Sequence, residues 1–155
     1  MKNKNSRNMI GYGSKNFKIE WPNKARLAVQ IVLNYEEGAE SSVLNGDKYS
    51  ETFLSEIIGA KPIKGRNINM ESLYEYGSRI GFWRLHELFQ KKKIPITIFG
   101  VGMALDKNPD VCKAIKEANY EVASHGWRWI DYQNIKKAIE KKHMKLAIDK
   151  IKKIF

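Results

Sequence analysis

Three short segments along the chain have the pattern of β-strands. They cover residues 27–33 (Leu-Ala-Val-Gln-Ile-Val-Leu), residues 94–99 (Ile-Pro-Ile-Thr-Ile-Phe) and about 120–123. The first is a nearly continuous run of apolar and β-branched residues, which is typical of a strand that is buried on both faces of a parallel sheet. The sequence therefore predicts three strands that are separated by long connections.

Two longer stretches instead repeat their apolar residues at helical spacing. Residues 71–90 and the C-terminal residues 135–155 each place apolar side chains along one face of a helix. In the first stretch, Gly77 and Gly81 lie four residues apart and therefore share a face. Because glycine has no side chain, that face can pack closely against a neighbour.

The remaining segments complete the order of elements. Asn108 is a favoured N-cap and Pro109 suits the first helical position, so a helix is expected from there to about residue 118. Residues 39–69 are expected to form a long loop insertion, with one short helical candidate at 51–58. The alternation of strands and helices predicts an α/β fold of parallel β/α units, either as an open sheet or as part of a barrel.

Each predicted strand runs into a distinctive cluster. The first is followed by residues 35–38 (Tyr-Glu-Glu-Gly), the second by 100–102 (Gly-Val-Gly) and the third by 124–126 (Ser-His-Gly). Ligands of parallel sheets and barrels bind beyond the carboxyl ends of the strands. We therefore expect the three clusters to meet at one edge of the sheet and to form the functional site.

The paired glutamates Glu36 and Glu37 are the sharpest chemical feature. Adjacent residues of a strand point to opposite faces, so both carboxylates can serve one pocket only if the strand ends here, as Gly38 suggests. Two carboxylates in one pocket disfavour each other's ionisation, which can leave one as a general base and the other as an acid or a ligand. The alternative is a pair of solvated glutamates at a strand end.

His125 is the only histidine in such a position. It could bind a metal, move a proton or donate to an oxyanion, and the alternative is a hydrogen-bonded structural residue. His86 and His143 are expected to be structural or solvated. The single cysteine, Cys112, excludes an intramolecular disulfide, and the spacing supports no structural zinc site.

Composition adds the setting. The chain has 155 residues, enough for one domain, and a formal net charge of +11. The last 20 residues hold eight lysines and two acids, which is typical of a solvated helix face, although a basic nucleic-acid-binding module is an alternative. Residues 1–9 lack the apolar core of a signal peptide, and no run of about 20 apolar residues could span a membrane. We therefore expect a cytoplasmic protein.

Several of these motifs are similar to those of a known family. Residues 35–38 resemble the first motif, Phe-Asp-Asp-Gly, of the polysaccharide deacetylases (the NodB-homology family). Residues 96–102, the Asn-Pro pair at 108–109 and residues 121–125 are similar to the stretch that leads into the family's second motif, His-Ser/Thr-x-x-His. The resemblance therefore includes the two clusters that carry the acidic residues and the histidine.

Longer segments resemble one branch of that superfamily more closely. Residues 33–40, 69–79 and 124–132 are similar to the bacterial allantoinases, which are thought to work without a metal. The resemblance runs from about Met9 to the C-terminus. It implies that residues 1–155 form a truncated deacetylase-like domain, made of the parallel β/α units of about half of an irregular (β/α)7 barrel.

The resemblance also implies roles for individual residues. In deacetylases the positions of Glu36, Glu37 and His125 hold the general base, a carboxylate ligand of the metal and the first of two histidine ligands. Trp129 stands in place of the second histidine, and an indole offers no lone pair to a metal. No cofactor is therefore expected, and a divalent metal is disfavoured.

On the allantoinase pattern, the reaction would be hydrolysis of a carbon–nitrogen bond other than a peptide bond, in a small amide substrate. Glu36 or Glu37 would deprotonate water, and His125 with backbone amides would stabilise the oxyanion. Trp127 and Trp129 are expected to wall a dry, flat pocket. Together with Tyr35 and Gly100 they are the expected substrate-binding residues.

The length of the chain qualifies this expectation. The family's later motifs, which include an Arg-x-Pro loop and a further catalytic histidine, would lie beyond Phe155. Half of a barrel leaves an open edge strand and an uncovered apolar face. The alternative to an active hydrolase is therefore an inactive remnant, or a half-protein that forms a homo-oligomer or needs a complementary chain.

Overall fold

The computed structural model describes Arg7, residues 9–15, Lys18 and residues 20–155. The prediction that residues 1–9 contain no signal peptide falls largely outside these residues. Over the part of the chain that is described, none of the helices combines the length and the apolar character that a membrane crossing requires.

A three-stranded parallel sheet forms the centre of the fold. Its strands are β1 (Val32–Tyr35), β2 (Thr97–Gly100) and β3 (Glu121–Ser124), paired in the order β1-β2-β3. Tyr35 lies opposite Gly100, and Gly100 lies opposite Ser124. All three strands therefore end at the same level, which confirms that the three predicted clusters leave the sheet from one edge.

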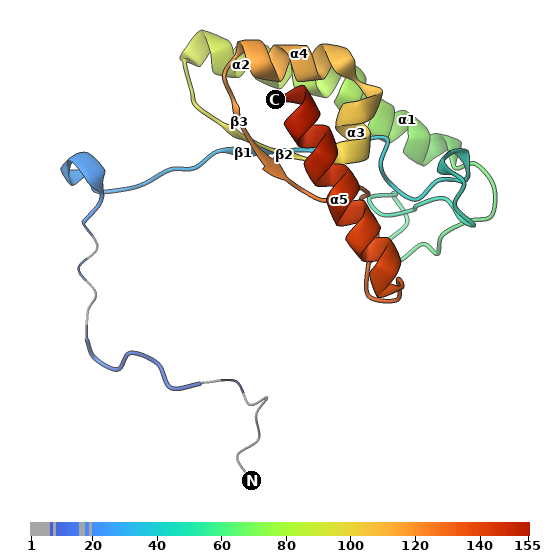
Figure 1. Cartoon of the computed structure of the whole chain (residues 1–155), viewed down its shortest axis with the longest axis horizontal. Helices are drawn as coiled ribbons and strands as arrows, with labels where there is room; N and C mark the ends of the chain where they lie inside the picture. Colours follow the sequence, from blue (N-terminus) through green and yellow to red (C-terminus); the bar gives the residue numbers. More distant parts are fainter. Residues whose placement is uncertain (1–6, 8, 16–17, 19) are drawn as a thin grey trace.

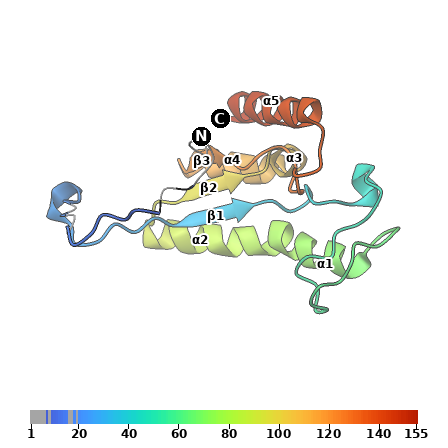
Figure 2. The same cartoon turned by 90° about the horizontal axis from the view of Figure 1, so that it is seen from below.

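Helices and short helical segments make up the other regular elements of the described chain. They are α1 (Ile68–Tyr76), α2 (Phe82–Lys92), α3 (Gly102–Lys107), α4 (Pro109–Glu117) and α5 (Lys137–Ile154), with the short segments η1 (Pro22–Lys24), η2 (Val43–Asn45) and η3 (Gly77–Gly81). Helices α2 and α4 cover the same face of the strands, and α5 lies in front of them (Figure 1). Seen from below, β1 and β2 are not overlaid by any helix of the described chain (Figure 2).

The core lies between the sheet and these helices. Burial alternates along β1 and is complete for Tyr35, as expected for a strand with one covered face. The largest fully buried side chains include Ile98 of β2, Leu105 of α3 and Ile115 of α4. The fold is thus a mixed α/β arrangement with an unclosed parallel sheet, as the sequence predicts.

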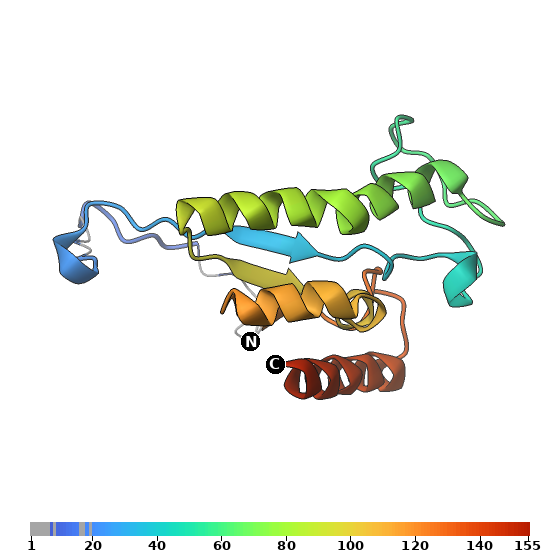
Figure 3. The same cartoon turned by 90° about the horizontal axis from the view of Figure 1, so that it is seen from above.

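The predicted helices are present, and the one predicted at 71–90 is longer than expected. The stretch predicted at 71–90 begins at Ile68 and continues through η3, a π-helical segment, to Lys92 (Figure 3). The Asn108 side chain caps α4 by accepting the Val111 N–H at 3.2 Å. The C-terminal helix is confirmed as α5.

The strand boundaries are shifted toward the C-terminus. The first strand, predicted at 27–33, covers only Val32–Tyr35, and both Leu27 and Val29 are exposed. The strand is shorter than predicted because β2 pairs with β1 over only four residues, from Val32 opposite Thr97 to Tyr35 opposite Gly100. The prediction that residues 27–31 are buried on both faces is therefore wrong.

Two further corrections concern helices. The candidate at 51–58 is a series of turns, because the hydroxyl of Thr52 donates to the Ala60 carbonyl at 2.7 Å and that of Ser55 to the Ile57 carbonyl at 2.9 Å. Such local bonds compete with helical ones. Conversely, α3 begins at Gly102, where no helix start was expected.

The core assignment predicts that Ile98→Ala destabilises the chain by about 2–5 kcal/mol, the usual cost of a large-to-small substitution at a buried site. Ile98 is 0% exposed, whereas Ile58 is 101% exposed, so Ile58→Ala is the matched control with little effect. Urea unfolding followed by circular dichroism measures both free energies. Equal losses for the two variants would contradict the assignment.

Candidate functional site

Two glycines turn the chain immediately after the candidate catalytic residues. Gly38 follows Glu37 with φ +93°, and Gly126 follows His125 with φ +80°. Side chains other than glycine rarely adopt this region of φ. The backbone therefore leaves β1 and β3 in sharp turns, which keeps the residues before each glycine at the edge of the sheet.

Glu36 and His125 meet at this edge. The His125 Nε2 lies 3.0 Å from the Glu36 Oε1, with the two side chains 37% and 21% exposed. The Asn34 amide also donates to the Glu36 Oε1 at 3.0 Å, and the His125 ring stacks on Phe99 with centroids 5.9 Å apart. A carboxylate and an imidazole that lie in contact and remain accessible can exchange protons with a bound substrate.

Glu37 points the other way. Its Oε2 accepts the Glu36 backbone N–H at 3.2 Å, and its carboxyl group lies against Gly77 of η3. With Tyr35 it lines a separate cavity of about 360 Å³. The alternation of β1 thus persists beyond its last residue, so the expectation that both glutamates face one pocket is wrong for Glu37.

A cavity of about 480 Å³ opens beside His125. Trp129 lines it, as expected, and its ring contacts Phe53 at a centroid distance of 5.6 Å. Tyr74 also contacts the indole in an edge-to-face arrangement, with centroids 6.3 Å apart. Phe53 was missed at the sequence level because it lies in the loop insertion, far from the strand ends in sequence.

The other three expected substrate-binding residues do not line this cavity. Trp127 packs on Gly102, where a Cβ would come within 2.8 Å of the indole Cε3 and 3.3 Å of the Ala147 Cα. Gly100 packs under Leu105. Tyr35 is buried and its hydroxyl accepts the Asn108 amide at 2.9 Å. These residues form the frame of the site, because their side of the sheet faces the helices.

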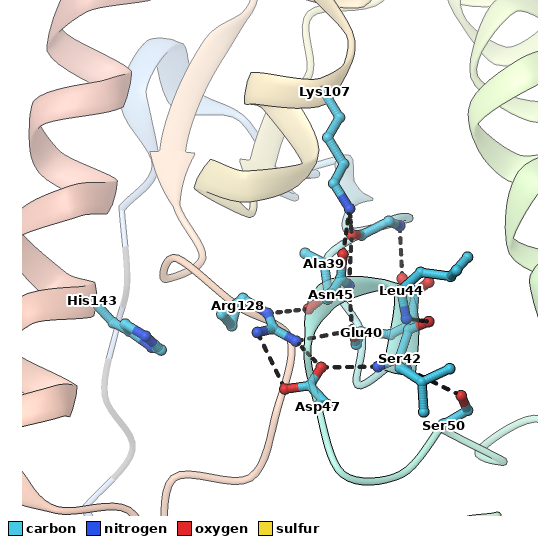
Figure 4. Close-up of polar contacts among 12 residues, drawn as sticks. Ala39, Glu40, Ser42, Leu44, Asn45, Asp47, Ser50, Lys107, Arg128 and His143 are labelled. Atoms are coloured by element: carbon cyan, nitrogen blue, oxygen red, sulfur yellow. Dashed lines mark hydrogen bonds and ion pairs between the residues drawn. The ribbon is translucent and has the colours of Figure 1, made fainter. Parts of the chain in front are cut away.

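Arg128 links the segment that follows β3 to the segment that follows β1 (Figure 4). Its guanidinium donates to the carbonyls of Ala39 at 3.0 Å and Glu40 at 3.1 Å, and forms a salt bridge with Asp47 at 2.5 Å. The backbone N–H of Trp129 donates to the same Ala39 carbonyl at 3.0 Å. No local sequence signal points to this link, since Arg128 and Asp47 lie far apart in the chain.

The geometry does not suit a metal ion. Over the described part of the chain, no three His, Cys, Asp or Glu side chains come together in a metal-binding arrangement. Glu37 turns away from His125, and Trp129 offers no ligand atom. The residues present therefore do not fit the metal site of the deacetylases.

Burial sets the electrostatics of Glu37. It raises the pKa of the Glu37 carboxyl above its ordinary value near 4.5, and the charges of Glu36 and Glu40 add to this shift. When an acid has a higher pKa in the folded state than in the unfolded state, the free energy of unfolding falls as the pH rises between these two pKa values. Below that interval the group is neutral in both states and the penalty vanishes.

We therefore expect Glu37→Gln to raise the Tm at pH 7 and to lose this advantage as the pH falls below about 4.5. Melting curves across this pH range measure the difference. Glu56→Gln, in an exposed loop, is the control and should match the parent protein at every pH. A Tm difference for Glu37→Gln that does not change with pH would contradict the burial of this charge.

Comparisons with known proteins show what the chain resembles in sequence and in fold. The sequence model of the family "Polysaccharide deacetylase" matches residues 70–155. A protein of Schizosaccharomyces pombe (strain 972 / ATCC 24843), named provisionally as a polysaccharide deacetylase, is 46% identical over 136 residues, which are 86% of this chain and 42% of that protein.

Two solved structures superpose on the chain with a TM-score of 0.88. One is the crystal structure of Puue allantoinase, with 53% sequence identity. The match covers 96% of this chain and 49% of the allantoinase chain. A protein of Pseudomonas aeruginosa PAO1, also named provisionally as a polysaccharide deacetylase, is 50% identical, with 96% and 50% covered.

The chain thus spans about half the length of the relatives that it matches. The matches confirm the resemblance drawn from the motifs and the fold of a partial deacetylase-type barrel, and they give no support to the nucleic-acid-binding alternative. The family model covers more than half of the residues of the chain. The chain therefore belongs to the polysaccharide deacetylase family.

Proposed function

We propose that the site hydrolyses a carbon–nitrogen bond of a small amide, with Glu36 and His125 as its catalytic pair. The observation that carries this proposal is the 3.0 Å contact between the two side chains at the carboxyl edge of the sheet. It is supported by the similarity to Puue allantoinase and to proteins named as deacetylases.

The reaction follows from the donors and acceptors at this edge. The Glu36 carboxylate takes a proton from a water molecule, whose oxygen then forms a bond to the carbonyl carbon of the amide. His125 donates a hydrogen bond to the oxygen that becomes negatively charged. The carbon–nitrogen bond breaks when the proton held by Glu36 passes to the leaving nitrogen, so water is divided between the two products.

The cavity beside His125 favours a flat substrate. Phe53 and Trp129 form an aromatic wall, and Arg128 and Asp131 supply polar groups to the same cavity. A planar cyclic amide can stack on such a wall while its carbonyl faces His125.

A cytoplasmic setting fits the free thiol of Cys112.

The catalytic assignment predicts that Glu36→Gln and His125→Asn each lower kcat by about 10²–10⁴-fold, the usual contribution of a general acid or base. Purified chain is incubated with allantoin and, separately, with an N-acetylated sugar oligomer. Glu56→Gln is the control and should keep the parent rate. Turnover that survives both substitutions would refute the assignment.

A second candidate function rests on the open side of the sheet. The outer edges of β1 and β3 have no strand partner within the described residues, and Val32 is exposed on the uncovered face. Unpaired edges and uncovered faces are sites of association. As the alternative to a chain that is active alone, we propose that further β/α units, in the same polypeptide or in a second one, cover this side and that the site is active only then.

This proposal predicts that the chain binds the C-terminal half of Puue allantoinase, which it does not cover, and that hydrolysis appears only in the mixture. Size-exclusion chromatography and hydrogen exchange at β1 measure the association. Val32→Asp should abolish it by placing a charge on the open face, whereas Ile58→Asp, in an exposed loop, should not. A lone chain that melts cooperatively as a monomer and does not bind that half would contradict the proposal.

A further inference from the structure

The two glycines of the π-helical segment η3 have the same backbone but different surroundings. Gly77 has φ −56° and ψ −52°, and Gly81 has φ −57° and ψ −50°. Both conformations are open to alanine, so neither glycine is required by the backbone. The reason for a glycine must therefore be sought in what a side chain would meet.

At Gly77 a side chain would meet Glu37. A Cβ there would lie 2.9 Å from the Glu37 Cδ and 3.1 Å from its Cγ, and closer still to the Oε1. At Gly81 the nearest atom is the Tyr76 carbonyl oxygen at 3.6 Å, an ordinary van der Waals distance. Gly77 alone of the two makes room for a carboxyl group.

The Glu37 carboxyl is also held from its other side. Its Oε2 accepts the backbone N–H of Glu36 at 3.2 Å, so the place of the carboxyl decides how that peptide group is oriented. Glu36 follows the exposed face of β1 and reaches His125. A chain of three contacts thus leads from η3 to the catalytic pair.

We propose that Gly77 is a positioning residue, which seats the Glu37 carboxyl against η3 and thereby fixes the turn that directs Glu36 to His125. The inference deepens the proposed function, on which the catalytic meaning of the pair rests. π-helical turns inside α-helices are often found at functional sites, and this one receives the side chain of a strand-end motif. Glu37 then serves as an anchor, and Glu36 is the residue that contacts the substrate.

The substitution Gly77→Ala separates this role from simple packing. The displaced group is the end of a flexible side chain, and the adjacent cavity, lined by Tyr74, Ser78 and Glu37, has room to receive it. The helix therefore does not have to move. Alanine also has the higher helix propensity, so the variant should fold and melt at a temperature no lower than that of the parent chain.

The main measurement is hydrogen exchange of the Glu36 amide, followed by NMR. Gly77→Ala and Glu37→Ala should each speed this exchange about five- to tenfold, as expected for the loss of one ordinary hydrogen bond. Gly81→Ala is the matched control and should leave the exchange rate unchanged. Glu37→Gln keeps an acceptor oxygen and should preserve the slow exchange.

A double variant tests whether Gly77 acts through Glu37. If it does, Gly77→Ala adds nothing in a Glu37→Ala background, because the group that it displaces is already absent. Additive effects would overturn the proposal, and so would unchanged exchange in Gly77→Ala. These readouts do not depend on turnover, so a failure to hydrolyse any amide, both by the chain alone and in the mixture with the C-terminal half, refutes the proposed function without deciding this one. Where turnover is measured, Gly77→Ala should lower kcat and leave KM unchanged.

Discussion

In-register pairing of the three parallel strands determines where the functional groups of this chain lie. Tyr35, Gly100 and Ser124 stand side by side at the last rung of the sheet. Backbone hydrogen bonds continue this level beyond the strands, since the Val101 N–H donates to the Tyr35 carbonyl and the His125 N–H to the Gly100 carbonyl, both at 3.0 Å. A shift of one residue in either pairing would place Glu36 and His125 at different heights and would separate them.

Successive side chains along β1 point to opposite faces of the sheet, so they lie in different environments. One series continues from Asn34 to Glu36 and meets Phe99 and His125 on the uncovered face. The other continues from Tyr35 to Glu37 and is buried against the helices. Two neighbouring glutamates therefore have different environments, and burial raises the pKa of the Glu37 carboxyl above its ordinary value.

Local patterns in the sequence were sufficient for the elements and for the edge at which they end. The apolar run around Ile98, the Asn108 cap and the glycines at 38 and 126 each act within a few residues, so their effect is readable. Long-range contacts were not readable in the same way. The salt bridge of Arg128 with Asp47 and the packing of Trp127 on Gly102 depend on how distant segments meet. The extent of β1 was also misjudged, because it is limited by the partner strand and not by its own residues.

The uncovered face of the sheet has an electrostatic consequence. Bulk solvent reaches the side on which His125 and Glu36 lie, so the effective dielectric constant around them is high. A hydrogen bond or a charge stabilises a developing oxyanion far less in such surroundings than in a closed one. Any layer that excludes solvent from this face would therefore strengthen the field of the pair while leaving each of its atoms in place.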